Sequence, residues 1–296
     1  MKVIKPTTMV AGMIQYSSTT ELYATYSAVT AYTTGTKVVY GNYIYTATTS
    51  TTGNQPDISP AQWSVFGPSN KWAAFDPQVS TASDDLGDIE FKVATGNCDS
   101  LALVNLTGTK ARVIIKDGIA GPTVYDSGDI TLDRAVITDW YLYFFEPFTQ
   151  VNTLVLSGLP SYVNASMDIK VSAAPLTVVA IGNVSFGNAA NIGGAQYGTT
   201  LGITDYSRKN TDEFGVTTFV KRSFSSRVNT KLWVLNTDFD RVYGVLADLR
   251  ATPCMWVGTD DSNYQSLNVF GFYRDFTMDI QYFSASMCTL EIEGLT

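Results

Sequence analysis

A tight hairpin at residues 38–45 constrains the fold of this chain more than any other sequence feature. Gly41-Asn42 lies between the two expected strands, with Val38 and Tyr40 at alternate positions of the first strand and Tyr43 and Tyr45 at alternate positions of the second. Two-residue hairpin loops of one common type place glycine first, because that position requires a positive φ. Cross-strand pairs of aromatic and β-branched residues then contribute up to about 1 kcal/mol each. The predicted pairs are Tyr40 with Tyr43 and Val38 with Tyr45.

A hairpin of this size is not stable alone and needs a cover over its tyrosine face. Pro56 and Pro60 stiffen the loop that follows, and that loop can return the indole of Trp63 over the rings. We therefore expect residues 27–69 to form one small β unit that ends in a turn-rich linker. Its aromatic rings either form a miniature core or present a binding face.

Nine residues of this unit follow a pattern found in small polysaccharide-binding modules: Tyr32, Gly35, Val38, Tyr40, Gly41, Tyr45, Ala47, Pro56 and Trp63. With this pattern the unit resembles the chitin- and cellulose-binding modules of carbohydrate-binding families five and twelve. Those modules carry an exposed aromatic pair after the Tyr-x-Ala strand, where this sequence has Thr49 and Ser50. Weak or no binding to chitin and cellulose is therefore expected. The sugar contacts that the resemblance implies are Tyr32, Tyr43, Tyr45 and Trp63.

Charge and composition narrow the class of partner. The 296 residues include 19 Lys and Arg against 27 Asp and Glu, and this net charge of −8 disfavours nucleic acid as a partner. Charged residues make up 16% and aromatic residues 12%, with 23 glycines, a balance typical of β-rich extracellular or assembly proteins. No window approaches about 20 consecutive apolar residues, so no membrane span is expected. The first residues lack a signal-peptide pattern, which predicts synthesis in the cytoplasm.

Residues 70–182 are expected to form an antiparallel β-sandwich with a jelly-roll-like layout. Short apolar runs alternate with turn signals at the spacing typical of such folds. The Asp-Gly-Ser clusters between them are typical of solvated turns. Three widely separated cysteines match no metal spacing, so neither a metal site nor a cofactor is predicted. The expected strands lie within 89–93, 101–103, 113–115, 124–125, 140–145, 151–156 and 167–171.

Residues 183–296 combine strand patterns with one amphipathic helix. Apolar residues recur at helical spacing from Phe239 to Leu249, with Thr237 and Asp238 as candidate caps and Pro253 beyond the end. This region is therefore predicted to be an α+β domain. Residues 1–26 are rich in Thr and Ser and are interpreted as an N-terminal arm. The chain as a whole is predicted to be mainly β and multidomain.

Several blocks in the last third of the chain form a recognisable set: 194–198, 205–209, 212–215, 220–223, 246–254, 271–276 and 291–295. With these blocks the region resembles the C-terminal region of structural proteins carried by tailed bacteriophages and prophages. The resemblance implies a tail, baseplate or fibre-associated component of the virion, made in the host cytoplasm. On this basis we expect a homo-oligomer whose partners are other tail or baseplate proteins and, as a further candidate, host-surface polysaccharide.

A concentration of basic residues lies in the same region. Six basic residues, together with Asp212 and Glu213, give a local charge of +4 in a chain of net −8. Such an asymmetry suits docking on an acidic surface of a partner or of a second copy. The alternative is a solvated hairpin face whose ion pairs contribute at most about 1 kcal/mol each. The candidate interface residues are Arg208, Lys209, Lys221, Arg222, Arg227 and Lys231.

Catalysis finds little support in the sequence. The chain has no histidine, no G-x-S-x-G elbow and no phosphate-binding glycine loop before a helix, so no catalytic residue is predicted and the protein is not expected to be an enzyme. The first hypothesis is a structural protein of a phage tail tip or baseplate that joins tail components or contacts host-surface glycans. A glycan-binding adhesion protein is the alternative. A glycoside hydrolase acting through two carboxylates is the less favoured third.

Overall fold

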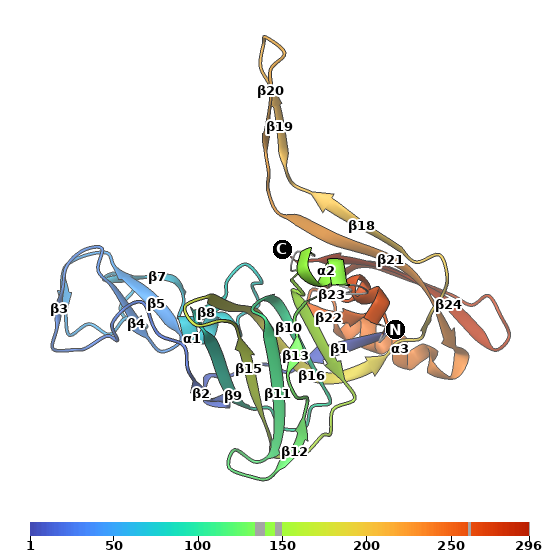
Figure 1. Cartoon of the computed structure of the whole chain (residues 1–296), viewed down its shortest axis with the longest axis horizontal. Helices are drawn as coiled ribbons and strands as arrows, with labels where there is room; N and C mark the ends of the chain where they lie inside the picture. Colours follow the sequence, from blue (N-terminus) through green and yellow to red (C-terminus); the bar gives the residue numbers. More distant parts are fainter. Residues whose placement is uncertain (134–139, 146–149, 260–261, 296) are drawn as a thin grey trace.

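The structure, a computed structural model, describes residues 1–133, 140–145, 150–259 and 262–295. Figure 1 shows a small β module at one end, a β-sandwich in the middle and a C-terminal region from which a long hairpin projects. Most of the regular structure is strand, and one main helix lies near the C-terminus. The predicted mainly-β class is confirmed.

The larger sheet has eleven strands and continues from the sandwich into the C-terminal region. Its order is β14-β10-β16-β1-β22-β23-β24-β21-β17, with β8 pairing with β16 and β18 pairing with β21. The strand bounds are β1 Lys2–Pro6, β8 Ser83–Leu86, β10 Ser100–Thr107, β14 Thr153–Ser157, β16 Val178–Asn191, β17 Gly194–Ala195, β18 Thr200–Asp205, β21 Phe224–Leu235, β22 Cys254–Val257, β23 Val269–Asp279 and β24 Ala285–Gly294.

The second sheet has six strands and packs on one half of the larger sheet. Its order is β12-β11-β15-β9-β2, with β13 pairing with β11. Alternate residues point into the sandwich, as in β9, where Ile89, Phe91 and Val93 are buried and face Leu101 and Leu103 of β10 in one core. The bounds are β2 Ile14–Ser17, β9 Asp88–Ala94, β11 Lys110–Asp117, β12 Thr123–Asp126, β13 Ile130–Thr131 and β15 Ala165–Ser172.

Two of the predicted boundaries fall within this shared sheet. The division expected between residues 182 and 183 falls inside β16, which pairs with β10 on one side and with β1 on the other. The segment 1–26, expected as a separate arm, supplies β1 to the middle of the larger sheet and β2 to the smaller one. Backbone hydrogen bonding across the whole sheet therefore joins the sandwich and the C-terminal region into a single continuous structure.

The main helix, α3, spans Phe239–Asp248 and covers one face of the C-terminal half of the larger sheet. Val242 and Leu246 are buried against residues of β21, β24 and β22, including Val234, Cys288 and Trp256. The amphipathic pattern thus placed the helix correctly. The helix ends at Asp248, one residue before the expected Leu249, and the chain then turns at Ala251, which has φ +55°.

One predicted strand is a helix. Residues 140–145 form α2, Trp140–Phe145, and no described strand pairs with them. Aromatic residues favour strands only where a neighbouring strand is available, whereas a helix satisfies backbone groups within the segment itself. The remaining short helices are α1 Asn70–Ala73, η1 Ala11–Met13, η2 Asn236–Asp238 and η3 Ser262–Leu267.

The small module has its own sheets and its own core. β4 (Lys37–Tyr40), β5 (Tyr43–Ala47) and β7 (Trp63–Pro68) form a three-stranded sheet, and β3 (Ala31–Tyr32) pairs with β6 (Thr51–Thr52). The hairpin has the predicted register, with Tyr40 opposite Tyr43 and Val38 opposite Tyr45. Gly41 has φ +61°, as the first position of this turn requires.

Candidate interaction surfaces

The aromatic residues predicted to contact sugar lie mostly inside the small module. Tyr32 and Tyr45 are buried, and Trp63 is 2% exposed, in a core with Val38 and Ala47. The Trp63 indole N–H donates to the carbonyl oxygen of Asn54 at 2.9 Å. Rings packed in this way cannot stack on a sugar, so the assignment of these three residues as sugar contacts is not supported by the structure. Tyr43 alone of the four is exposed, at 44%.

A further ring in this core comes from outside the expected boundary. Tyr26 stacks on Tyr32 with ring centroids 5.6 Å apart and meets Tyr40 and Trp63 edge to face. The backbone N–H of Tyr26 also donates to the carbonyl oxygen of Val39 at 2.9 Å. Sequence reasoning assigned this residue to the N-terminal arm, although a tyrosine at this distance from the hairpin was a usable signal.

The burial of these rings leads to a prediction about polysaccharides. A fragment spanning residues 20–70 should not be retained on insoluble chitin or cellulose, because Tyr43 offers one ring where the related modules use an exposed pair. A pull-down at micromolar protein measures retention, with a chitin-binding module as positive control. Firm retention that disappears in the variant Tyr43→Ala would contradict the prediction and restore this face as a binding site.

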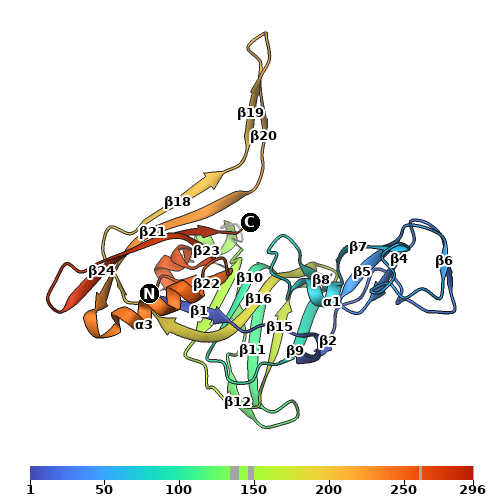
Figure 2. The ribbon, with the colours of Figure 1, turned by 180° about the vertical axis from the view of Figure 1, so that it is seen from behind.

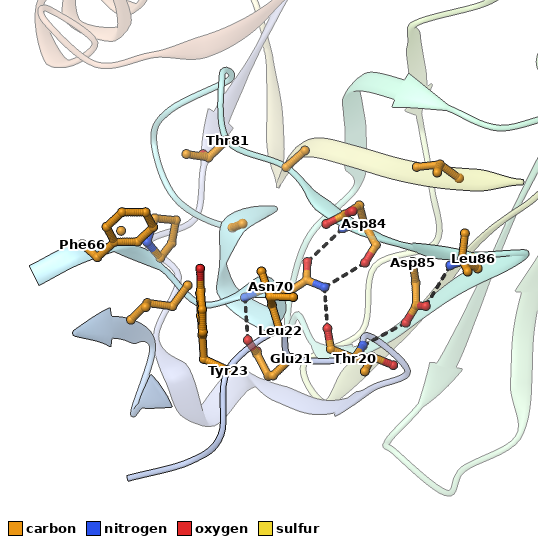
Figure 3. A pocket seen from close by; sticks show the side chains of 16 residues that line it. Thr20, Glu21, Leu22, Tyr23, Phe66, Asn70, Thr81, Asp84, Asp85 and Leu86 are labelled. Carbon is orange, nitrogen blue, oxygen red and sulfur yellow. Dashed lines mark hydrogen bonds between the residues drawn. The ribbon is translucent and has the colours of Figure 1, made fainter. Parts of the chain in front are cut away.

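A groove of about 680 Å³ lies where the module meets the sandwich (Figure 3). Three stretches of chain contribute most of its walls: 20–23 before the module, 66–73 after it, and 81–86 leading into β8. Figure 3 shows Phe66 and Tyr23 toward one end, with Asp84 and Asp85 toward the other. The groove therefore has an aromatic end and an acidic end.

A hydrogen-bond network holds the floor of the groove in place. The carboxylate of Glu21 accepts the backbone N–H groups of Asn70 and Lys71, both at 3.0 Å, at the start of α1. The Asn70 side-chain amide donates to the carbonyl oxygens of Thr20 and Asp84, both at 2.8 Å. These bonds join the two sides of the junction, so the groove is preformed.

Asp85 belongs to the same network. Its carboxylate accepts the backbone N–H of Leu86 and that of Thr20, both at 2.8 Å. These bonds, led by the one from Leu86, lower the pKa of Asp85, so the group is negatively charged at neutral pH. The side chain of Asp84 lies exposed beside it. No lysine or arginine is among the lining residues, and three carboxylates are.

The aromatic end of the groove already holds a cation. The ammonium of Lys37 lies 3.3 Å from the ring centroid of Phe66 and 5.5 Å from that of Tyr23. Leu22, beside these rings, is 82% exposed, and Phe66 is 57% exposed. An exposed leucine and an exposed ring next to carboxylates suit a partner that combines apolar and cationic groups.

The second candidate surface is the projecting hairpin, called the arm here and defined as residues 206–223. β19 (Arg208–Thr211) and β20 (Thr217–Val220) pair only with each other, and both Figure 1 and Figure 2 show the hairpin standing away from the body. No residue of the arm is buried. Phe214 is 91% exposed and Phe219 is 74% exposed, so the arm offers large apolar side chains to solvent.

The six basic candidates separate into two groups. Arg208, Lys209, Lys221 and Arg222 lie at the base of the arm, on or next to β19 and β20. Within the described stretches of the chain, none of these four forms an ion pair. Arg227 and Lys231 lie instead on the exposed face of β21, opposite Glu293 and Thr289 of β24. The structure therefore supports one basic arm and a separate mixed-charge sheet face.

Other kinds of site find no support in the described residues. No group of three or more Cys, Asp or Glu side chains there could hold a metal ion. None of the described helices is long and apolar enough to cross a membrane. The three cysteines are buried free thiols, and burial raises the pKa of Cys254 to about 12 and that of Cys288 to about 11.

Comparisons with known proteins add one distant similarity. No protein-family model and no curated protein matches the chain. Among solved structures, an F5/8 type C domain of a Bacteroides fragilis protein matches with a TM-score of 0.24 and 10% identity. The match covers 38% of this chain and 77% of the other. A similarity of this extent supports no inference about function.

Proposed function

We propose that this chain is a structural protein of a phage tail tip or baseplate that assembles with other subunits through its arm. The observation that carries the proposal is the exposure of the arm, none of whose residues is buried in the body. In this proposal the protein acts by binding rather than by catalysis. Its place is the virion, and its partners are further copies and neighbouring tail components.

The physical argument concerns the stability of the arm. A two-stranded hairpin without a third strand or a packed face is marginally stable in water. Phe214, Phe219 and Val220 together expose apolar surface that a partner could bury. Burial contributes about 1.5–3 kcal/mol for each large apolar side chain, which is enough to order the hairpin in an assembly. Phage assemblies repeat one interface around a symmetry axis, so a modest contact is multiplied.

A second candidate is a glycan-binding adhesion protein. The exposed ring of Tyr43 and the aromatic end of the junction groove favour it, because sugars stack on exposed aromatic faces and bond to nearby carboxylates. The groove also lies at the junction of two structural units, where small-ligand sites are frequent. Binding to a glycan array that is lost in Phe66→Ala would favour this candidate over assembly alone.

Removing the arm tests the first proposal. Residues 207–222 are replaced by Asn-Gly, which closes a two-residue turn after β18 and before β21 while the pairing of Asp205 with Phe224 is kept. We expect the armless variant to keep the native circular dichroism spectrum and melting temperature. No described residue of 207–222 is buried, and the variant keeps Tyr206, whose hydroxyl donates to the Glu293 carboxylate of the body at 3.3 Å. Self-association or incorporation into particles should be lost.

Light scattering after gel filtration measures self-association, and quantitative blotting of purified particles measures incorporation. The control is the fourfold variant with Arg208, Lys209, Lys221 and Arg222 all replaced by Gln, which keeps the arm and should weaken assembly less. An armless protein that assembles as the full chain does would overturn the proposal.

A further inference from the structure

We infer that the arm of one copy docks in the junction groove of a second copy. This inference rests on the proposed assembly function and deepens it, because it names the partner and the place where the arm binds. The arm strands β19 and β20 pair with no other described strand, and the groove is the preformed hollow where the module meets the sandwich. Figures 1 and 2 both show the arm extending away from the body and separated from its own module.

Charge is the first reason for this choice of partner. The arm has four basic and two acidic residues, a net +2 in a chain of net −8, so the rest of the chain carries −10. The groove is lined by Glu21, Asp84 and Asp85 and by no basic residue. Lys37, over Phe66, and Lys71, on α1, are the cations beside it. A basic arm is therefore attracted to the body of another copy and toward this groove.

The same charges argue against pairing of two arms. Arg208, Lys209, Lys221 and Arg222 gather at the base of the hairpin, and two arms laid side by side in the same direction would bring these groups together. Like charges held in contact oppose association. Docking on an acidic surface removes this repulsion, whereas contact between two arms in the same direction retains it.

The kinds of side chain on the two surfaces are also complementary. Lys209 and Phe219 are opposite each other in the register, so one face of the arm presents a cation next to an aromatic ring. The groove presents carboxylates next to Phe66 and the exposed Leu22. Its volume of about 680 Å³ accommodates several side chains. Such docking joins two different surfaces, so it is head to tail and produces a ring or an open chain of subunits.

A complementation experiment tests the inference with full chains. The groove variant carries Leu22→Arg and Asp84→Lys, which change exposed side chains and leave the backbone bonds of the floor in place. The armless variant described above keeps the groove. We expect each to be monomeric alone, and we expect an equimolar mixture to form a 1:1 dimer, because the groove of the armless variant and the arm of the groove variant are intact. Sedimentation velocity measures all three samples.

The control variant, Val163→Arg with Asp279→Lys, makes similar changes of residue size and charge on exposed positions outside the groove. It should associate as the unmodified chain does.

The outcomes separate the inference from the proposed function. If the armless variant is monomeric but the groove variant associates like the control, the arm binds somewhere other than the groove. The docking site is then wrong, and the proposed function still holds. If the armless variant still associates, both are wrong. If the full chain is monomeric at every concentration, the inference that the partner is a second copy is wrong. Incorporation into particles then decides whether the proposed function holds.

Discussion

Replacing Ile4 by aspartate is expected to prevent the chain from folding. Ile4 lies on β1, in the middle of the eleven-stranded sheet, opposite Ala189 of β16 and Met255 of β22. Its side chain is fully buried in a core with Val104 and Phe270. An isolated carboxylate in such a place must be protonated or must pull water into the core, and either outcome costs several kcal/mol. Domains have about 5–15 kcal/mol of stability in total, so little of it would remain.

The measurement is the dispersion of amide signals in the NMR spectrum, together with the thermal unfolding curve. Lys5→Ala is the matched control on the same strand. Lys5 makes an ion pair with Asp248 at 3.5 Å, and the two side chains are 43% and 71% exposed. Exposed pairs contribute about 0–1 kcal/mol, so this variant should unfold close to the unmodified chain. A dispersed spectrum and a native melting temperature for Ile4→Asp would show that β1 is dispensable.

The second large effect concerns the small module. Trp63→Ala should unfold the module while the two large sheets stay folded. The indole is packed edge to face on Tyr26 and Tyr32, with ring centroids 5.9 Å and 5.4 Å away, and it donates the hydrogen bond to Asn54. Losing a buried tryptophan costs about 3–5 kcal/mol, and a unit this small has few other buried side chains with which to offset it.

Limited proteolysis followed by mass spectrometry measures this outcome. Cleavage should appear within residues 27–66 of Trp63→Ala at temperatures where the rest of the chain remains resistant. Tyr43→Ala is the control, since Tyr43 is an exposed ring on the same hairpin and its loss should leave the cleavage pattern unchanged. Should Trp63→Ala lose module and body together in one transition, the module would be an integral element of the body rather than a unit with its own core.

Local features were predictable from the sequence where the pattern is short-range. The hairpin register followed from Gly41-Asn42 and the alternation around it. The helix α3 followed from apolar spacing that includes Val242 and Leu246. The basic arm residues were identified as an interface candidate, but sequence reasoning could not show that Arg208 and Arg227 lie on different surfaces, because a strand pattern does not indicate where a hairpin leaves its sheet.

Some of the missed structure had a usable signal. From Arg227 onward β21 alternates between buried residues, including Val228, Leu232 and Val234, and exposed residues such as Lys231, a pattern typical of a half-buried strand. The junction groove had none, because 20–23 and 81–86 meet only after the module and the sandwich have both folded. Its polar residues resemble ordinary turn residues in the sequence, and only their hydrogen bonds show that they hold a preformed hollow.

The sequence by itself determined the mainly-β class, the register of the hairpin and the single main helix, because each depends on turn chemistry or on the spacing of residues that are close together in the chain. It left open whether the rings of the module form a core or a binding face, and the tertiary structure buries Tyr32, Tyr45 and Trp63. Only the tertiary structure decided how these elements join. β16 is buried over most of its length on both faces and contains Gly182 and Gly187, where a Cβ atom would meet Asn105 Cβ at 2.6 Å and the Lys5 carbonyl oxygen at 1.8 Å. Such a strand shows neither alternation nor high strand propensity. β16 pairs with β1, which lies near the start of the chain. This pairing is therefore set by close packing of segments that are distant in the sequence, and no local sequence pattern predicts it.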